Sequence, residues 1–330
     1  MGGGRLLEVS GLKMYHVIRK GLLGGKMYVK AVDGVDLFLD RGEAVAIVGE
    51  SGSGKTTLGK TILRIYEPLD GKIVFDGRDV THLKGKKLKE YRREVGFVQQ
   101  DPYGALPPFM TVKQILEEPL KIHKLGTKEE RYERVCRALE EVKLTPVEDF
   151  LHKYPHMLSG GQQQRVVIAR SIITDPKLVI ADEPVSMLDA SVRVEVLRLL
   201  ESIQHRRNIG IIYITHDLST TKYFSDRINI MYAGKILEGG PSREVIANPL
   251  HPYTRYLINA LPDPDAKNRF VKRDVPPGEP PSLINPPAGC RFHPRCPFAI
   301  KGLCDSKEPG YTYVDEHHFV RCWLYGKDVE

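Results

Sequence analysis

The sequence predicts an α/β fold with a mixed, mainly parallel sheet. Residues 44–48 form a short apolar run, which is followed by a glycine-rich turn and then by helical spacing of apolar residues. Two later runs, residues 178–183 and 210–215, are almost purely apolar, as expected of parallel strands buried on both faces. Between about residues 111 and 170 the pattern changes to helical periodicity with many charges. The fold class is therefore a parallel-strand core with an inserted α-helical subdomain.

The glycine-rich turn reads Gly-Glu-Ser-Gly-Ser-Gly-Lys-Thr from Gly49 to Thr56 and fits the pattern G-x-x-x-x-G-K-[ST] at every fixed position. Glycines let backbone N–H groups turn toward an anion, and the following helix adds the positive end of its dipole. Lys55 would reach the β- and γ-phosphates of a triphosphate, and Thr56 would offer a hydroxyl to Mg²⁺. A chance match is the alternative, but the flanking strand and helix favour a P-loop nucleotide-binding core.

Two extended segments precede this core, at residues 6–12 and 29–39, joined by a glycine-containing connection through Lys26. They predict a small antiparallel β subdomain beside the main sheet. Tyr15 lies where an aromatic ring could stack on a nucleotide base. The alternative for Tyr15 is a half-buried strand tyrosine.

Polar side chains stand at the ends of three later strands: Gln100, the pair Asp182-Glu183, and His216. In open parallel sheets, ligands bind at the carboxyl ends of the strands. We expect Gln100 to contact Mg²⁺ and the attacking water, and Asp182 to hold Mg²⁺. Glu183 would accept a proton from that water, and His216 would sense the γ-phosphate. Each of these residues, taken alone, could instead be a solvated polar side chain.

The helical insertion carries a second candidate anion site. The run Ser159-Gly160-Gly161-Gln162 stands directly before an apolar helix. Serine is a favourable N-cap, and the two glycines leave backbone N–H groups open at a positive helix end. An ordinary helix cap explains the same residues equally well.

Another helix of the insertion spans about residues 129–144. Tyr132, Val135, Cys136 and Leu139 share one of its faces. We therefore expect Cys136 to pack in the core.

The composition is that of an ordinary soluble globular protein, with 41% hydrophobic and 28% charged residues among 330. A formal net charge of +7 could favour nucleic acid, but the basic residues are spread out except at residues 84–89, so we expect a solvated surface and no nucleic-acid partner. No run of about eighteen apolar residues is present, and Met-Gly-Gly-Gly-Arg has no signal-peptide core. We expect a cytoplasmic chain that does not itself cross a membrane.

The C-terminal extension is rich in proline and cysteine. The passage from Pro262 to Pro287 predicts stiff, extended segments, and four of the five cysteines follow it, at Cys290, Cys296, Cys304 and Cys322. Disulfides are not expected in a reducing cytosol, whereas four thiolates can hold zinc or an iron–sulfur cluster. Zinc ligands usually come in closely spaced pairs, and these gaps are wider and unequal. Four free thiols are the remaining alternative. A metal would pin a tail that has no core of its own.

Together these motifs resemble those of ATP-binding cassette (ABC) transporter ATPase subunits over residues 1–245. The loop, Gln100, the Ser159 motif, the strand ending in Glu183, the turn at residues 186–189 and His216 follow the family's order and spacing. The resemblance implies that ATP and Mg²⁺ bind, that Tyr15 stacks on adenine, and that the Ser159 motif completes the site of an opposing subunit. It implies catalytic roles for Lys55, Gln100, Glu183 and His216; Mg²⁺ contacts for Thr56, Gln100 and Asp182; and nucleotide contacts for Tyr15, Gly49, Glu50, Ser51, Gly52, Ser53, Gly54, Lys55, Thr56, Thr57, Ser159, Gly160, Gly161, Gln162 and Asp189.

The tail narrows the resemblance to the oligopeptide and dipeptide importer branch. His-Pro-Tyr-Thr at residues 251–254 and Cys-Arg-Phe-His-Pro-Arg-Cys-Pro at residues 290–297 resemble that branch. Some of its members carry a [4Fe-4S] cluster on cysteines placed like these, which favours a cluster over zinc. The resemblance implies an ATPase on the cytoplasmic face of the membrane, paired with a paralogous ATPase chain or a second copy of itself. Its other partners would be two permease subunits and an extracytoplasmic substrate-binding protein.

The resemblance also divides the chain into an ATPase domain, residues 1–245, with its helical insertion at about residues 103–170, and an extension, residues 246–330, with a four-cysteine metal site. Peptides are the expected cargo, although the same branch also serves oligosaccharides and nickel. A soluble cassette ATPase acting on ribosomes or DNA is an alternative from another class, but neither a second cassette nor a long coiled-coil insertion is visible. A pure metal-binding module would leave the cassette unexplained.

Overall fold

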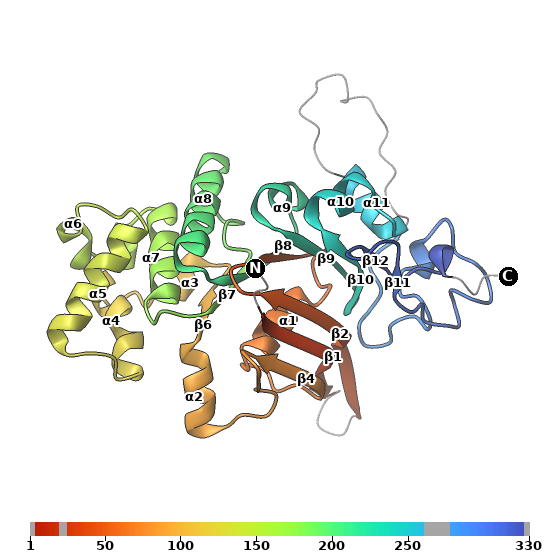
Figure 1. The fold of residues 1–330 in the computed structure, drawn as a ribbon, viewed down its shortest axis with the longest axis horizontal. Helices are drawn as coiled ribbons and strands as arrows, with labels where there is room; N and C mark the ends of the chain where they lie inside the picture. The colour runs from red at the N-terminus through yellow and green to blue at the C-terminus, as the bar shows by residue number, and fades with distance from the viewer. Residues whose placement is uncertain (1–3, 20–24, 261–277, 327–330) are drawn as a thin grey trace, which may run out of the picture. The chain divides into compact units, whose positions relative to one another are not determined.

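The structure is a computed structural model that describes residues 4–19, 25–260 and 278–326 (Figure 1). Chain contacts divide it into two compact units: unit 1 contains Met1–Glu8, Phe38–Ala44 and Val74–Ile214, and unit 2 contains Val9–Leu37, Val45–Ile73 and Thr215–Glu330. None of the described helices is both long and apolar enough to span a membrane. Part of the predicted glycine-containing connection and residues 261–277 of the proline-rich passage lie outside the described residues.

Unit 1 contains the parallel strands β6 (Val95–Val98), β7 (Leu178–Asp182) and, up to Ile214, β8 (Gly210–Thr215). Val95 pairs with Leu178, and Leu178 pairs with Gly210. All residues of β7 and β8 are buried, as their apolar composition predicts. A Cβ on Gly96 would lie 2.3 Å from the carbonyl oxygen of Ser171, so this glycine lets a helix approach the sheet closely.

Three helices of unit 1 begin at a capping box. Thr111, Thr127 and Ser159 each form a capping box, in which the cap side chain and the third helical residue bond each other's backbone N–H. Helices α4, α5 and α6 lie together (Figure 1). The helices are α2 (Gly85–Arg93), α3 (Pro102–Ala105), α4 (Val112–Ile122), α5 (Lys128–Glu141), α6 (Glu148–Leu151), α7 (Gly160–Ile172) and α8 (Ala190–Arg207), with a 3-10 turn at Pro155–Met157.

Unit 2 contains a sheet in the order β11-β12-β10-β9-β3. Strand β3 (Ala44–Val48) runs parallel to β9 (Arg227–Tyr232), and β9 forms a hairpin with β10 (Lys235–Pro241). Its turn, Ala233-Gly234, has positive φ at both residues, as tight hairpins require. Two short strands that the sequence did not predict, β11 (Thr312–Tyr313) and β12 (Phe319–Val320), extend the sheet.

The N-terminal strands β1 (Arg5–Arg19) and β2 (Lys26–Asp40) are longer than predicted and lie next to each other in a second sheet, in the order β2-β1-β4-β5. Strands β4 (Asp70–Phe75) and β5 (Arg78–Asp79) are antiparallel. The helices of unit 2 are α1 (Lys55–Ile62), α9 (Leu218–Phe224), α10 (Ser242–Ala247) and α11 (Pro252–Asn259), with 3-10 turns at His293–Arg295 and Trp323–Tyr325.

Two expectations about packing are wrong. The tail does have a core: Phe292 is fully buried, and its ring packs against those of Tyr232 and Tyr253 at centroid distances of 5.3 and 5.4 Å. This core could not be predicted from the sequence, because its residues lie far apart along the chain. Cys136 is only half-buried, since α5 buries Val135, Ala138 and Leu139, and the flank that carries Cys136 and Tyr132 reaches the surface.

Candidate nucleotide-binding site

The glycine-rich loop of unit 2 joins β3 to α1 in a geometry that only glycine allows at key points. Gly54 has φ 107°, and a Cβ there would lie 2.0 Å from the carbonyl oxygen of Ala31. A Cβ on Gly49 would lie 2.0 Å from the carbonyl oxygen of Met231 on β9. The loop is thus held between two backbone segments, which fixes the direction of its N–H groups.

Lys55 lies across this loop and is 5% exposed. Its ammonium nitrogen donates hydrogen bonds to the carbonyl oxygens of Gly49 and Glu50, at 2.8 and 2.9 Å. Ser53 Oγ lies 3.4 Å from the same nitrogen. The positive charge is therefore held inside the turn of the loop, where it can meet a phosphate group.

Tyr15 lies on β1 and is half-buried. Its hydroxyl donates a hydrogen bond to Asp33 on β2, which also accepts a hydrogen bond from Arg291. Burial opposes ionisation of Asp33, but the hydrogen bond from Tyr15 and the charge of Arg291 outweigh it, so the pKa of Asp33 lies below its ordinary value. Burial and the bond to Asp33 raise the pKa of Tyr15.

Next to Tyr15, His16 contributes a contact that the sequence did not predict. Its Nε2 lies 3.3 Å from Oγ1 of Thr57, a residue on α1, and its ring packs edge-on against Tyr66 at 5.1 Å. The β1 segment that carries Tyr15 is thereby joined to the helix that follows the loop. Thr57 was predicted to contact nucleotide, and in the structure its hydroxyl faces His16.

Glu50, the second residue of the loop, is held by residues from the far end of the chain. Its N–H donates to the hydroxyl oxygen of Tyr253 at 2.9 Å, and its carboxylate lies 3.0 Å from Nη1 of Arg295. Tyr232 accepts a hydrogen bond from the same nitrogen at 3.3 Å. Residues 290–297 were singled out for their cysteines and their family resemblance, so these contacts with the loop were missed.

His216 follows β8 directly and is exposed. Its neighbour Asp217 caps α9, accepting a hydrogen bond from the N–H of Ser219 at 2.9 Å. The N–H of Asp217 in turn donates to Thr215 Oγ1 at 3.0 Å. These bonds fix the backbone on both sides of the histidine.

In unit 1, Asp182 and Glu183 lie at the end of β7. Asp182 is 3% exposed. Glu183 has φ 46°, which is a left-handed backbone conformation. This conformation is uncommon in residues other than glycine and is often found at functional sites. Gln100 donates a hydrogen bond from Nε2 to the Glu183 carboxylate at 2.9 Å. Gln100 and Glu183 are thus joined within one unit, a pairing that the sequence did not predict, whereas the predicted contact of Gln100 with Mg²⁺ stays a prediction.

Ser159 is the N-cap of α7, and its hydroxyl accepts a hydrogen bond from the N–H of Gln162 at 3.3 Å. A Cβ would lie 2.7 Å from the Tyr103 hydroxyl at Gly160 and 2.8 Å from a methyl group of Val192 at Gly161, but both are ends of side chains and Tyr103 is 58% exposed, so packing does not by itself require either glycine. Ser159 therefore forms an ordinary helix cap, and α7 begins with two glycines, which carry no side chain.

The predicted Mg²⁺ contacts come from both units: Thr56 belongs to unit 2, whereas Gln100 and Asp182 belong to unit 1. Their joint binding of one ion stays a prediction. Asp189, expected to contact nucleotide, is the exposed N-cap residue of α8.

Cys290, Cys296, Cys304 and Cys322 are all free thiols in unit 2. Each sulfur accepts a backbone N–H: those of Phe292, Phe298 and Leu324 lie two residues after their cysteines, and that of Ile300 lies 3.3 Å from Cys304 Sγ. Burial raises the pKa of Cys290 to about 12 and that of Cys322 to about 11, helped by the other thiols nearby. Cys290 and Cys322 are therefore protonated at neutral pH, and a metal would displace their protons.

The sulfur spacing bears on the kind of metal. Sulfur ligands around a tetrahedral zinc lie about 3.8 Å apart, given Zn–S bonds of about 2.3 Å. Within the part of the chain that the structure describes, no three of these sulfur atoms lie within 4.8 Å of one another. In a [4Fe-4S] cluster each cysteine binds a different iron, so the four sulfurs need not lie that close to one another.

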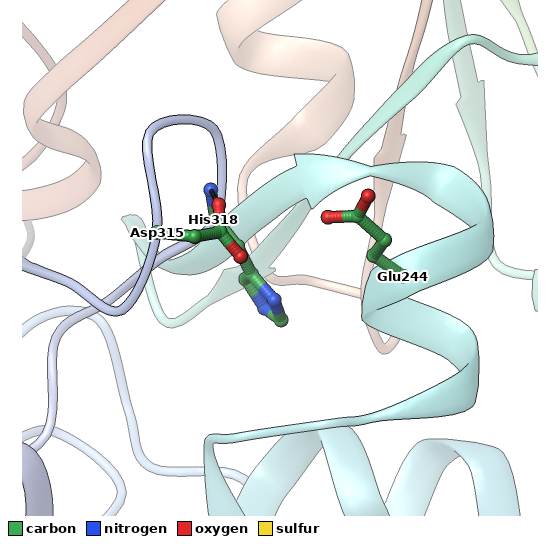
Figure 2. Close-up of side chains that lie close together, drawn as sticks. All are labelled: Glu244, Asp315 and His318. Atoms are coloured by element: carbon green, nitrogen blue, oxygen red, sulfur yellow. Dashed lines mark hydrogen bonds between the residues drawn. The ribbon is translucent and has the colours of Figure 1, made fainter.

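Another group of potential metal ligands consists of Glu244 on α10 with Asp315 and His318 on the loop before β12 (Figure 2). Two of these residues are exposed. His318 Nε2 lies 2.8 Å from the buried carboxylate of Glu238, which also accepts the N–H groups of Leu250 and His251. The histidine therefore serves to link β12 to β10 and the start of α11.

Comparison with known proteins gives matches over nearly the whole chain. Residues 32–186 match the ABC transporter family model, and residues 237–304 match the C-terminal region of oligopeptide/dipeptide transporters. The chain is 45% identical to the oligopeptide transport ATP-binding protein AppF of Bacillus subtilis, over 97% of both chains. It is 40% identical to the dipeptide transport ATP-binding protein DppF of Haemophilus influenzae, over 96% of both. The dimeric post-hydrolysis structure of the ATP-binding cassette MJ0796 with ADP and phosphate superposes with a TM-score of 0.63 at 30% identity, covering 72% of this chain and 99% of that one.

Proposed function

Because the chain belongs to the ABC transporter ATP-binding family and carries the oligopeptide/dipeptide C-terminal region, we propose that it is the ATP-hydrolysing subunit of a peptide importer. The single observation that carries this proposal is similarity over nearly the full length to peptide transport ATP-binding proteins. The alternatives of a ribosome- or DNA-acting cassette and of a pure metal-binding module are not supported by any of these relatives.

Each residue of the site has a separate role in binding or hydrolysing ATP. The loop N–H groups and Lys55 bind the phosphates, and Tyr15 stacks on the base. Gln100 holds the Glu183 carboxylate in place, and Glu183 takes a proton from the attacking water. His216 would orient the γ-phosphate. Mg²⁺, held by Thr56, Gln100 and Asp182, would neutralise the developing charge on the phosphates.

The Ser159 motif needs a second cassette to act on nucleotide. Its capped helix end offers backbone N–H groups that a γ-phosphate bound by another subunit could meet. MJ0796 is described as a dimeric cassette, which supports pairing of this chain with a paralogue or with a second copy of itself. Two permease subunits and an extracytoplasmic binding protein complete the importer, and the ATPase would sit on the cytoplasmic face of the membrane.

The division into an ATPase domain, residues 1–245 with a helical insertion at about 103–170, and an extension, residues 246–330, is part of the proposal. The separate family matches at residues 32–186 and 237–304 support it. In the extension, we propose that the four cysteines hold a [4Fe-4S] cluster, because their gaps along the sequence are wider and less regular than those of paired zinc ligands, no three of their sulfurs lie within 4.8 Å of one another among the described residues, and each sulfur already accepts an N–H. Such a cluster would cross-link the tail.

The test is reconstitution of the chain with its permease partners in liposomes, measuring ATP hydrolysis with the binding protein loaded with peptide, oligosaccharide or nickel. Peptide is expected to stimulate hydrolysis in the wild type, and Glu183→Gln is expected to abolish it. Stimulation by sugar or nickel alone would reassign the cargo, and hydrolysis that is absent under all conditions would refute the proposal.

A further inference from the structure

The segment between Cys290 and Cys296 places two buried arginines against the nucleotide-binding loop and its neighbours in unit 2. The side chains of Arg291 and Arg295 are only 5% and 8% exposed. Charged side chains are rarely buried this deeply unless they are paired, and each of these has a carboxylate partner. The partners, Asp33 and Glu50, both belong to the surroundings of the predicted nucleotide.

Arg295 acts on the phosphate end of the site. It holds the carboxylate of Glu50 at 3.0 Å, while Tyr253 accepts the N–H of the same residue at 2.9 Å. Glu50 is thus held at both backbone and side chain. A carboxylate within a loop that binds a triphosphate would repel it, and the guanidinium both neutralises this charge and keeps the side chain in one place.

Arg291 acts on the base end. It donates hydrogen bonds to Asp33 and to the carbonyl of Ala233. Asp33 accepts the hydroxyl of Tyr15, so the arginine and the predicted base-stacking ring share one carboxylate. The residue after Ala233 donates its N–H to the carbonyl of Ser53 at 2.8 Å, which connects the same arginine to the loop through the hairpin turn.

We propose that Arg291 and Arg295 are positioning residues that set the affinity of the site for ATP, Arg295 through Glu50 and Arg291 through Asp33 and Tyr15. The inference rests on the proposed ATPase function and deepens it, because it assigns the C-terminal extension a direct part in nucleotide binding. If the tail only stabilised the fold, there would be no need for both arginines to bond carboxylates of the nucleotide-binding region.

The first test measures KM and kcat for ATP hydrolysis by the full chain in its transporter. Arg295→Met is expected to raise KM about tenfold with kcat changed less than twofold, because an interaction that holds the ground-state site is lost. Arg295→Lys should recover part of the affinity. Arg321→Met is the matched control: this arginine of the tail has a side chain that is 11% exposed and bonds Pro309 and Glu308 instead.

A double-mutant cycle separates positioning from general stability. In a Glu50→Gln background, which carries no loop charge to compensate, Arg295→Met should change KM less than threefold. Likewise, Arg291→Met should raise KM in the wild type but much less in a Tyr15→Phe background, which lacks the hydroxyl that Asp33 holds. The inference is overturned if KM is unchanged in both arginine variants, or if their effects are the same in both backgrounds.

These outcomes are distinct from failure of the proposed function. A wild type that does not hydrolyse ATP in its transporter refutes the function itself. A wild type that hydrolyses ATP, loses binding on Lys55→Ala and ignores both arginine substitutions refutes only the positioning role.

Discussion

Lowering the pH from 7 to 5 is expected to destabilise unit 2 through His251. This histidine is 1% exposed and caps α11, with Nδ1 accepting the N–H of Tyr253 at 3.0 Å. Its Nε2 finds no hydrogen-bond partner among the described residues. Protonation would put a donor where the helix needs an acceptor and would bury a charge. Burial, assisted by Arg255, lowers the pKa of His251 from 6.5 to about 3.

The sign follows from where the proton binds. Between pH 6.5 and 3 the unfolded chain takes up a proton at this residue and the folded chain does not, so stability falls as the pH is lowered. From pH 7 to pH 5 the loss from this one group is about 2 kcal/mol, at about 1.36 kcal/mol per pKa unit. Below about pH 3 both states are protonated and the loss stops growing.

The assay is urea unfolding followed by the fluorescence of Trp323, the single tryptophan of the chain, which lies in unit 2. The comparison variant is His251→Asn, because asparagine can cap the helix but does not titrate. The wild type should lose about 2 kcal/mol more than the variant between pH 7 and pH 5. Equal losses in the two proteins would refute the assignment of a buried, neutral histidine.

Three further predictions concern the site and the tail. Glu183→Gln should retain ATP binding and lower turnover by about 10²- to 10⁴-fold; Glu140→Gln, on an exposed helix surface, is the control, and unchanged hydrolysis would reject Glu183 as the base. Lys55→Ala should weaken ATP binding at least about tenfold, since hydrogen bonds to charged groups contribute about 1.5–3 kcal/mol, whereas Lys60→Ala on the same helix should not; equal affinities would count against the phosphate role. Protein purified without oxygen should contain iron and sulfide near stoichiometric amounts, and replacing the cysteines by serine should remove both; zinc without iron would overturn the cluster. The cysteines to replace are Cys290, Cys296, Cys304 and Cys322.

Local patterns in the sequence predicted the parts of the fold that depend on neighbouring residues. The strand at residues 44–48, the loop after it and the apolar strands β7 and β8 each follow from a few consecutive side chains. The N-cap at Ser159 was also predicted, because this serine stands directly before an apolar helix. Such short-range features need no knowledge of what the chain packs against.

Contacts between distant residues were not predictable in this way. Glu50 and Arg295 are 245 positions apart, and Asp33 and Arg291 are 258 apart. Nothing in the spacing of either arginine indicates its partner. The same reason explains why the core around Phe292 was missed, because its members come from β9, α11 and the cysteine segment. The prediction that Cys136 packs in the core was wrong for a different reason. Helical spacing identified the face of α5 that is buried but not how far around the helix the burial extends, and Cys136 lies beyond it.

The segments that form unit 2 lie far apart along the chain, and this affects how the protein folds during its synthesis. The glycine-rich loop leaves the ribosome early, whereas Arg295, which holds Glu50, follows 245 residues later. At translation rates of about 5–20 residues per second, that delay is roughly 10–50 seconds. Residues 74–214 of unit 1 form one continuous stretch and can begin to fold in the meantime. In incomplete chains the side chain of Glu50 therefore has not yet met Arg295. A nascent chain that stops before residue 291 lacks both Arg291 and Arg295.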